Sequence, residues 1–204
     1  MVFRARSRHS VRKTSTEKGG GVAYRLKKTV VMVGMMGSGK TAIGTALARV
    51  LAVPFLDSDA ELTAAANLTV PEIFERFGEA FFREKETQVI ARLLKEQTGI
   101  LSTGGGAYLD PGNRAMISDR GVAVWLRADL DLLWSRVRHK NTRPLLRTAN
   151  PLQTLKGLLE QRAPFYAEAD LVVDASPEYS IEDMTGKVID TLLTRPDVLE
   201  KEAA

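Results

Sequence analysis

Short apolar segments recur along the chain and alternate with longer segments of helical character. Five of them have the length of a strand, namely Thr29–Val33, Pro54–Leu56, Ile100–Ser102, Val122–Leu126 and Leu171–Val173. Several are apolar throughout, which is typical of strands that helices cover on both faces of a parallel sheet. The pattern therefore predicts five buried strands.

The segments between these strands carry helix signals. Lys40–Leu51 places Ile43, Leu47, Val50 and Leu51 on one helix face, at the i, i+4, i+7, i+8 spacing. Thr69 and Glu72 have the form of a capping box that begins a helix at Thr69. The other predicted helices are 79–96, 129–139, 151–167 and 180–193.

Alternating strands and helices predict an α/β fold, a three-layer sandwich around a five-stranded parallel sheet. In such sheets the ligand sites lie at the carboxyl ends of the strands. We therefore expect the chemistry directly after the predicted strands.

Residues 34–41 (GMMGSGKT) match the pattern G-x-x-x-x-G-K-[ST] between the first strand and the first helix. Glycines allow backbone N–H groups to surround phosphate oxygens, and the positive end of the helix favours the same anion. Lys40 is expected to reach the β- and γ-phosphates, and the Thr41 hydroxyl to bind Mg²⁺. The alternative is a glycine-rich turn with a solvated lysine. The predicted nucleotide-binding residues of this loop are Gly37, Ser38, Gly39, Lys40, Thr41 and Ala42.

Two carboxylates follow the second strand. Alternation along an extended chain points Asp57 and Asp59 the same way, toward the cleft. One carboxylate near Mg²⁺ and one near an acceptor hydroxyl would suit phosphoryl transfer. The structural alternative is that Asp59 caps the next helix while Asp57 is solvated.

Glycines and arginines follow the later strands. Gly104, Gly105 and Gly106 stand where a βα turn is expected, which suggests a close approach to the backbone. Arg83, Arg143 and Arg162 lie at element edges, where arginine is often a surface residue with a buried stem. Residues 138–150 lack an apolar period and contain five basic residues, which suits a mobile lid over phosphates.

Composition limits the remaining possibilities. A chain of 204 residues with 44% hydrophobic and 26% charged residues suits one soluble globular domain. No apolar run approaches the ~18 residues of a membrane span. The chain has no cysteine and two histidines, which excludes disulfides and thiolate sites and makes a multi-histidine metal centre an unsuitable interpretation.

Residues 1–28 differ from the rest of the chain. They carry nine Lys or Arg and one Glu, a net charge of +8 within a total of +4, so the remaining residues sum to −4. We predict a disordered basic extension over 1–28, a P-loop kinase domain over 29–193 and a C-terminal tail over 194–204. The alternatives for the extension are a solvated segment without an essential role, a transit peptide and a nucleic-acid-binding arm.

Six segments together resemble the shikimate kinase family, and the likeness spans residues 29 to about 190. They are GMMGSGKTAIG at 34–44, DSD at 57–59, FFREKE at 81–86, STGGGA at 102–107, RPLL at 143–146 and QRAPFYAEAD at 161–170. The resemblance implies a P-loop fold of nucleoside-monophosphate-kinase type with strand order 2-3-1-4-5. It also implies transfer of the ATP γ-phosphoryl group to the shikimate 3-hydroxyl, a step toward chorismate and the aromatic amino acids.

The resemblance also implies residue roles. On the acceptor side, Asp59 resembles the aspartate that holds the acceptor hydroxyls. Arg83 and Arg162 resemble the pair that holds the shikimate carboxylate beside Gly104, Gly105 and Gly106, and planar guanidinium groups suit that task.

On the nucleotide side, Arg143 resembles the lid arginine that reaches the transferred phosphate. Arg136 resembles the arginine packed on adenine, and Asp57 the carboxylate near Mg²⁺. The expected catalytic residues are thus Lys40, Asp59 and Arg143. Ala42 departs from the family, whose members often carry a second hydroxyl residue there.

Three other functions stay open on the sequence alone. Another carboxylated-polyol kinase, such as a gluconate kinase, would also suit the arginine pair. A nucleotide-dependent nucleic-acid-binding protein would suit the basic extension and predicts salt-sensitive binding. A catalytically inactive scaffold is disfavoured by the presence of Lys40, Thr41, Asp57 and Asp59. We expect a monomeric cytoplasmic enzyme that uses ATP, Mg²⁺ and shikimate, with no membrane or nucleic-acid partner.

Overall fold

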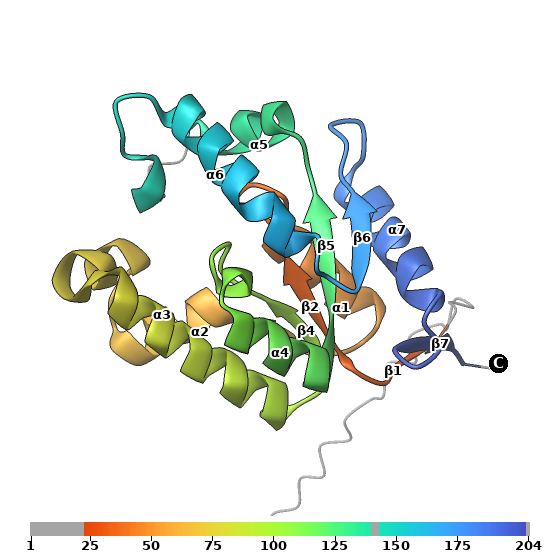
Figure 1. Cartoon of the computed structure of the whole chain (residues 1–204). Coiled ribbons are helices and arrows are strands. Elements are labelled where there is room, and N and C mark those ends of the chain that lie inside the picture. Colours follow the sequence, from red (N-terminus) through yellow and green to blue (C-terminus); the bar gives the residue numbers. More distant parts are fainter. Residues whose placement is uncertain (1–22, 140–142, 203–204) are drawn as a thin grey trace, which may run out of the picture.

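The fold is a central parallel sheet between two groups of helices, seen in a computed structural model that describes residues 23–139 and 143–202 (Figure 1). The strands of this sheet are β2 (Thr29–Val33), β3 (Phe55–Asp57), β4 (Ile100–Ser102), β5 (Gly121–Arg127) and β6 (Leu171–Asp174). They lie in the order β3-β4-β2-β5-β6, and every pairing is parallel. Numbered along the chain, this is the predicted order 2-3-1-4-5, so the predicted fold class is confirmed.

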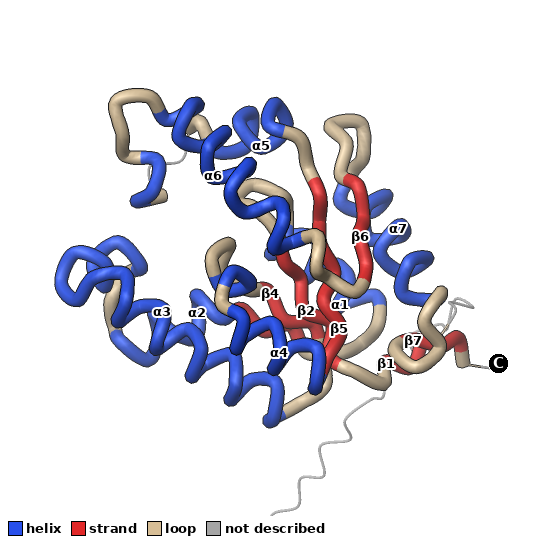
Figure 2. The backbone as a smooth tube through the Cα atoms, viewed as in Figure 1, coloured by secondary structure: helices blue, strands red, loops and turns tan. Residues whose placement is uncertain are grey.

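Seven helices surround the sheet in the described part of the chain (Figure 2). They are α1 (Lys40–Val50), α2 (Ser58–Ala66), α3 (Val70–Glu96), α4 (Pro111–Arg120), α5 (Leu130–Val137), α6 (Pro151–Tyr166) and α7 (Ile181–Leu193). Short 3₁₀ turns lie at Ala107–Leu109 and Pro144–Leu146. The predicted helices are all present, whereas α2 and α4 were not predicted. Each of these two buries a single apolar side chain, Leu62 in α2 and Ile117 in α4, so neither shows an apolar period.

Helix α3 begins with the predicted capping box. The Thr69 hydroxyl accepts a hydrogen bond from the Glu72 N–H, and the Glu72 carboxylate accepts one from the Thr69 N–H. Gly78 interrupts the helix with φ 81° and ψ 171°, a conformation that side chains rarely adopt. This break explains why the sequence predicted two helices here, one that begins at Thr69 and one over 79–96, where the structure has α3.

The sheet has an apolar core on each face. Val31 and Val33 pack with the side chains of α3, α4 and α6, whereas Val30 and Met32 pack with those of α1 and α7. Figure 1 shows α3 with α4 on one side of the sheet and α1 with α7 on the other. Burial on both faces explains why the strands are apolar without alternation. The carboxyl ends of β2, β3 and β4 meet at one edge and carry the loops of the site.

A second sheet, of two strands, shows that the folded domain extends further toward both ends of the chain than predicted. β1 (Tyr24–Leu26) pairs antiparallel with β7 (Leu199–Lys201), although these residues were assigned to the disordered extension and the tail. Leu199 is 1% exposed within the core beside α7, and Lys28 donates to Asp197 at 2.9 Å. Because β1 and β7 lie at opposite ends of the sequence, no local pattern of residues predicts that they pair. Residues 1–22 lie outside the described residues.

None of the helices among the described residues combines the length and the apolar composition that crossing a bilayer requires.

Candidate active site

The phosphate-binding loop joins β2 to α1 and lies against α5. Gly37 has φ 85°, and a Cβ added to it would lie 2.8 Å from Cγ1 of Val137. Gly39, which precedes the first residue of α1, has φ 102°. Only glycine satisfies both the dihedral angles and the close packing here, so the motif predicted from sequence has the backbone shape that cradles anions.

Lys40 is buried within this loop and is not a solvated side chain. Its Nζ donates to the carbonyl oxygens of Gly34 at 2.9 Å and Met35 at 3.0 Å, and the residue is 9% exposed. Burial lowers the pKa of Lys40 to about 8, and the charge of Arg143 acts in the same direction against that of Asp59. The ammonium group is thus held at the cradle, where negative phosphate charge would favour its protonated form.

Hydroxyl and carboxylate oxygens meet beside the cradle. The Thr41 hydroxyl donates to Oδ2 of Asp57 at 3.2 Å and lies 3.5 Å from the Ser102 hydroxyl. Such hard oxygen donors suit Mg²⁺, which retains several waters and binds few protein groups. No cluster of three or more His, Cys, Asp or Glu that could hold a metal occurs in the described ranges. The residues present fit a magnesium ion shared with nucleotide phosphates.

The geometry of the two aspartates differs from the prediction. Asp57 is the N-cap of α2 and accepts hydrogen bonds from the N–H groups of Asp59 at 3.0 Å and Ala60 at 3.2 Å. Asp59 lies in the first helical turn, so extended-chain alternation was the wrong reason for placing both at the cleft. The cap is also Asp57 and not Asp59. Because the helix begins so close to β3, both carboxylates still remain beside the P-loop.

Asp59 is half-buried, lines a small cavity and has one buried carboxylate oxygen. Its Oδ1 has no hydrogen-bond partner among the described residues. Burial raises the pKa of Asp59, as does the neighbouring charge of Asp57, whereas Lys40 and Arg143 lower it. A buried acceptor of this kind is suited to a substrate hydroxyl, because an unsatisfied buried carboxylate is costly.

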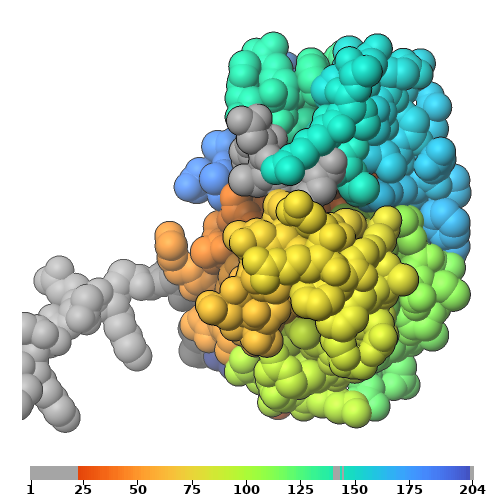
Figure 3. Space-filling model, turned by 90° about the vertical axis from the view of Figure 1, so that its left-hand side faces the viewer, coloured from red at the N-terminus to blue at the C-terminus, as the bar shows by residue number. Residues whose placement is uncertain are grey.

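The small cavity holds about 120 Å³ and gathers the predicted acceptor residues. Its lining comprises Met36, Asp59, Val70, Phe74, Phe82, Arg83, Glu86, Gly104, Gly105, Gly106, Arg143, Leu145 and Arg162. Arginines from three separate segments therefore converge on two carboxylates and a glycine loop. Figure 3 views the molecule from the side of α3, which lies below the segments of α5 and α6.

The glycine loop after β4 is in contact with the charged side chains. A Cβ on Gly104 would lie 2.9 Å from Oδ1 of Asp59 and would overlap with Glu86. A Cβ on Gly106 would overlap with the guanidinium group of Arg83. The expected close approach to this backbone is confirmed, and the approaching groups belong to the protein itself.

Glu86 is a site residue to which the sequence analysis gave no role. It is 0% exposed, and its Oε2 accepts a hydrogen bond from Nη1 of Arg83 at 2.7 Å. Burial raises the pKa of Glu86 to about 7, although the charge of Arg83 opposes the shift. The signal available in the sequence was its position three residues after Arg83, on the same helix face.

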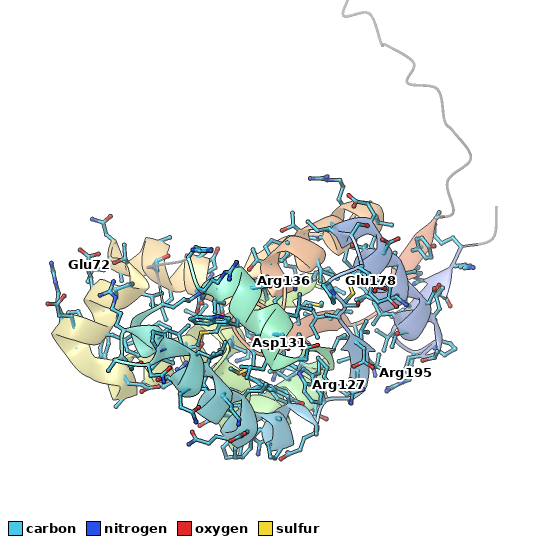
Figure 4. The ribbon with its side chains drawn as sticks, turned by 90° about the horizontal axis from the view of Figure 1, so that it is seen from above. Glu72, Arg127, Asp131, Arg136, Glu178 and Arg195 are labelled. Atoms are coloured by element: carbon cyan, nitrogen blue, oxygen red, sulfur yellow. The ribbon has the colours of Figure 1, made fainter. Side chains whose placement is uncertain are left out.

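A larger cavity of about 760 Å³ lies on the other side of the cradle. Arg136 projects from α5 into this region, and its Nη1 donates to the carbonyl oxygens of Gly37 at 3.2 Å and Ser38 at 3.3 Å (Figure 4). Residues Tyr179–Glu182 and Met184, at the start of α7, form the opposite wall and were not predicted. Lys40, Thr41 and Ala42 line the same cavity, as a nucleotide site requires.

Arg143 connects the two cavities because it lines both of them. Its Nε is buried without a hydrogen-bond partner in the described part of the chain. The predicted lid, 138–150, includes residues 140–142, which lie outside the described residues, so the lid itself stays a prediction. The arginine nevertheless borders both cavities, so it can contact a group bound in either of them.

Comparisons with known proteins show which proteins this chain is similar to. A family model described as shikimate kinase matches residues 36–193. A shikimate kinase from Cereibacter sphaeroides is 63% identical over 191 residues, covering 94% of this chain and 96% of the relative. One from Ruegeria pomeroyi is 64% identical over 180 residues, covering 88% and 92%. The solved shikimate kinase from Acinetobacter baumannii, in complex with shikimate, matches with TM-score 0.79 and 37% identity over 82% of this chain and 93% of that one.

Proposed function

The chain belongs to the shikimate kinase family, and from that premise we propose that its two adjoining cavities transfer the γ-phosphoryl group of ATP to the 3-hydroxyl of shikimate. The products are shikimate 3-phosphate and ADP, in the pathway to chorismate and aromatic amino acids. The observation that supports the assignment best is the placement of Arg143. It lines both the cavity beside the P-loop and the cavity with the converging arginines.

On the nucleotide side, the P-loop backbone and Lys40 bind the phosphates. Lys40 exchanges its bonds to the carbonyls of Gly34 and Met35 for phosphate oxygens, and the phosphate charge keeps the amine protonated. The Arg136 guanidinium and the wall at Tyr179–Glu182 hold the adenine end. Thr41 and Asp57 would hold a magnesium ion, which would supply charge neutralisation for the nucleotide phosphates.

On the acceptor side, Arg83 and Arg162 bind the shikimate carboxylate, because their planar groups form paired hydrogen bonds with it. Gly104, Gly105 and Gly106 supply a wall without side chains. Asp59 accepts hydrogen bonds from the acceptor hydroxyls and aligns one of them with the γ-phosphorus. Arg143 contacts the phosphoryl group during its transfer and stabilises its charge.

We also propose that the enzyme acts as a monomer without a nucleic-acid or membrane partner. All the groups assigned above come from one chain, and each lies in the described residues. The basic extension has no part in this chemistry, and its net charge of +8 does not extend to the body of the protein.

A coupled ADP-release assay with shikimate, quinate and gluconate tests the acceptor assignment. Shikimate should give the highest kcat/KM, by at least about tenfold over gluconate, because each mismatched charged hydrogen bond costs about 1.5–3 kcal/mol. The Lys40→Met variant serves as the zero-activity control. Equal turnover of gluconate and shikimate would reassign the enzyme to another polyol.

A further inference from the structure

Tyr166, the last residue of α6, is buried at the centre of the site's supporting structure. It is 0% exposed and is the largest of the fully buried side chains among the described residues. Its ring lies 6.0 Å from that of Trp125, between centroids, in the core beside β5. Tyr166 does not line either cavity, so it touches neither predicted substrate directly.

The hydroxyl of Tyr166 nevertheless contacts the acceptor wall. It donates a hydrogen bond to the carbonyl oxygen of Gly105, the middle residue of the glycine loop. The Sδ of Met35, in the P-loop, lies 3.8 Å from the same hydroxyl. One side chain of α6 therefore joins the loop after β4 to the loop after β2.

Arg162 lies one turn before Tyr166 on the same helix and is near both ends of this contact. Burial raises the pKa of Tyr166 to about 12, and the charge and hydrogen bonding of Arg162 act against that shift. A Cβ on Gly105 would lie 3.8 Å from Nη1 of Arg162 and 3.5 Å from the N atom of Met36. The Gly105 backbone is thus enclosed by the P-loop, Arg162 and Tyr166.

Three consecutive glycines have wide conformational freedom, so the loop requires an external contact to hold one arrangement. A hydrogen bond to the Gly105 carbonyl fixes the orientation of the whole peptide unit to Gly106, because that unit is planar. Without the hydroxyl, the carbonyl would be a buried acceptor lacking this partner and would favour a rotated peptide.

We propose that Tyr166 is a positioning residue for acceptor binding. Its hydroxyl holds the Gly105 carbonyl, and thereby aligns the glycine loop and Arg162 for the carboxylate of the acceptor. This inference rests on the proposed function of the pocket and adds to it a residue that acts through others.

Tyr166→Phe tests the proposal because it retains the ring and removes only the hydroxyl. The KM for shikimate should rise about fivefold to tenfold, the range for one lost hydrogen bond to a buried acceptor. The kcat should change less than about threefold, and the KM for ATP should stay unchanged, because the phosphate cradle retains its own contacts.

Tyr108→Phe is the matched control. Tyr108 is also buried, at 4% exposure, and its hydroxyl donates to the carbonyl of Glu168 at 3.3 Å, outside both cavities. A merely structural hydroxyl would lower the melting temperature in both variants and leave both KM values unchanged. An unchanged shikimate KM in Tyr166→Phe, or an equal rise in Tyr108→Phe, would overturn the proposal.

Amide hydrogen exchange of residues 104–106 gives a readout that does not depend on activity. Exchange should become faster in Tyr166→Phe and stay at the wild-type rate in Tyr108→Phe, and equal rates in all three proteins would overturn the proposal. If wild-type enzyme fails to phosphorylate shikimate, the proposed function fails, while the exchange result still reports on the loop contact.

Discussion

The phosphate cradle and the acceptor pocket are built in different ways, although they share one edge of the sheet. The cradle is formed by consecutive residues, 34–41, and its lysine is bonded to the carbonyls of the same loop. The acceptor pocket takes its charged groups from α2, α3, α6 and the segment at Arg143.

The two regions also differ in which buried atoms lack hydrogen-bond partners among the described residues. In the cradle the unpartnered side-chain atom is the neutral hydroxyl of Ser38, whereas in the pocket the atoms are Oδ1 of Asp59, Oε1 of Glu86 and Nε of Arg143. Polar atoms without a hydrogen-bond partner are costly when buried, and more so on ionisable side chains. The cradle is therefore organised by its own backbone, while the pocket gains most from a charged, hydroxylated ligand.

Lys40→Met should have the largest effect, because it removes the charged group of the phosphate cradle. Loss of the charge that opposes the phosphates should lower kcat by on the order of 10³-fold. Methionine removes the cost of burying the ammonium group, and this offsets the loss of its hydrogen bonds to the carbonyls of Gly34 and Met35, so the melting temperature should change little. Steady-state kinetics and thermal unfolding measure both effects, and unimpaired transfer would refute the P-loop assignment.

Asp59→Asn should impair the point at which the two regions meet. The amide keeps the shape of the side chain but loses its charge and basicity, so kcat should fall about 10²- to 10³-fold while the KM for shikimate rises. Calorimetry should still detect weakened shikimate binding. Near-normal turnover would mean that this carboxylate has no role beyond the first turn of α2.

Arg83→Ala and Arg162→Ala should affect the acceptor pocket alone. Each should weaken shikimate binding by about 1.5–3 kcal/mol, the range for hydrogen bonds to charged groups, with ATP affinity nearly unchanged. Because both act on one carboxylate, the double variant should cost less than the sum. A loss of ATP affinity with normal shikimate binding would place the pair on the nucleotide side.

The sequence could predict the cradle more completely than the pocket for a physical reason. The P-loop and the strands depend on contiguous residues or on burial of both faces, and both leave local patterns. The roles of Glu86 and Tyr166 depend on contacts with Gly104 and Gly105, which are distant in sequence.

The pairing of β1 with β7 likewise joins the two ends of the chain and has no local signal. Such contacts appear only once the fold brings the segments together, whereas the arginines were located through the family resemblance.

Glu86→Gln should show how much the buried carboxylate of the acceptor pocket makes the stability of the protein depend on pH. The pKa of Glu86 rises from 4.5 to about 7 on folding, so its contribution to stability is complete below pH 4.5 and is lost as pH rises to about 7. Glutamine does not ionise. The variant should therefore gain about 1–3 kcal/mol relative to wild type between pH 4.5 and 8.

Urea unfolding at several pH values measures this change. Glu84→Gln is the control, because Glu84 has a side chain that is 61% exposed. A difference between wild type and Glu86→Gln that does not vary with pH would show that Glu86 is ionised throughout.

Deletion of residues 1–22 should have the smallest effect, with rates within about twofold of wild type and an unchanged melting temperature. Deletion of residues 1–28 should lower the melting temperature, because it removes β1 and the ion pair of Lys28 with Asp197 at 2.9 Å. A tenfold loss of rate in the shorter deletion would place the basic extension in the site.

The central claim is that the two cavities act together to phosphorylate shikimate. Phosphorus-31 NMR of wild-type enzyme with ATP, Mg²⁺ and shikimate tests it most directly, because it separates transfer from hydrolysis. The account predicts one new phosphomonoester resonance that grows in equal amount with ADP. Formation of ADP with inorganic phosphate, and no phosphomonoester, would contradict it.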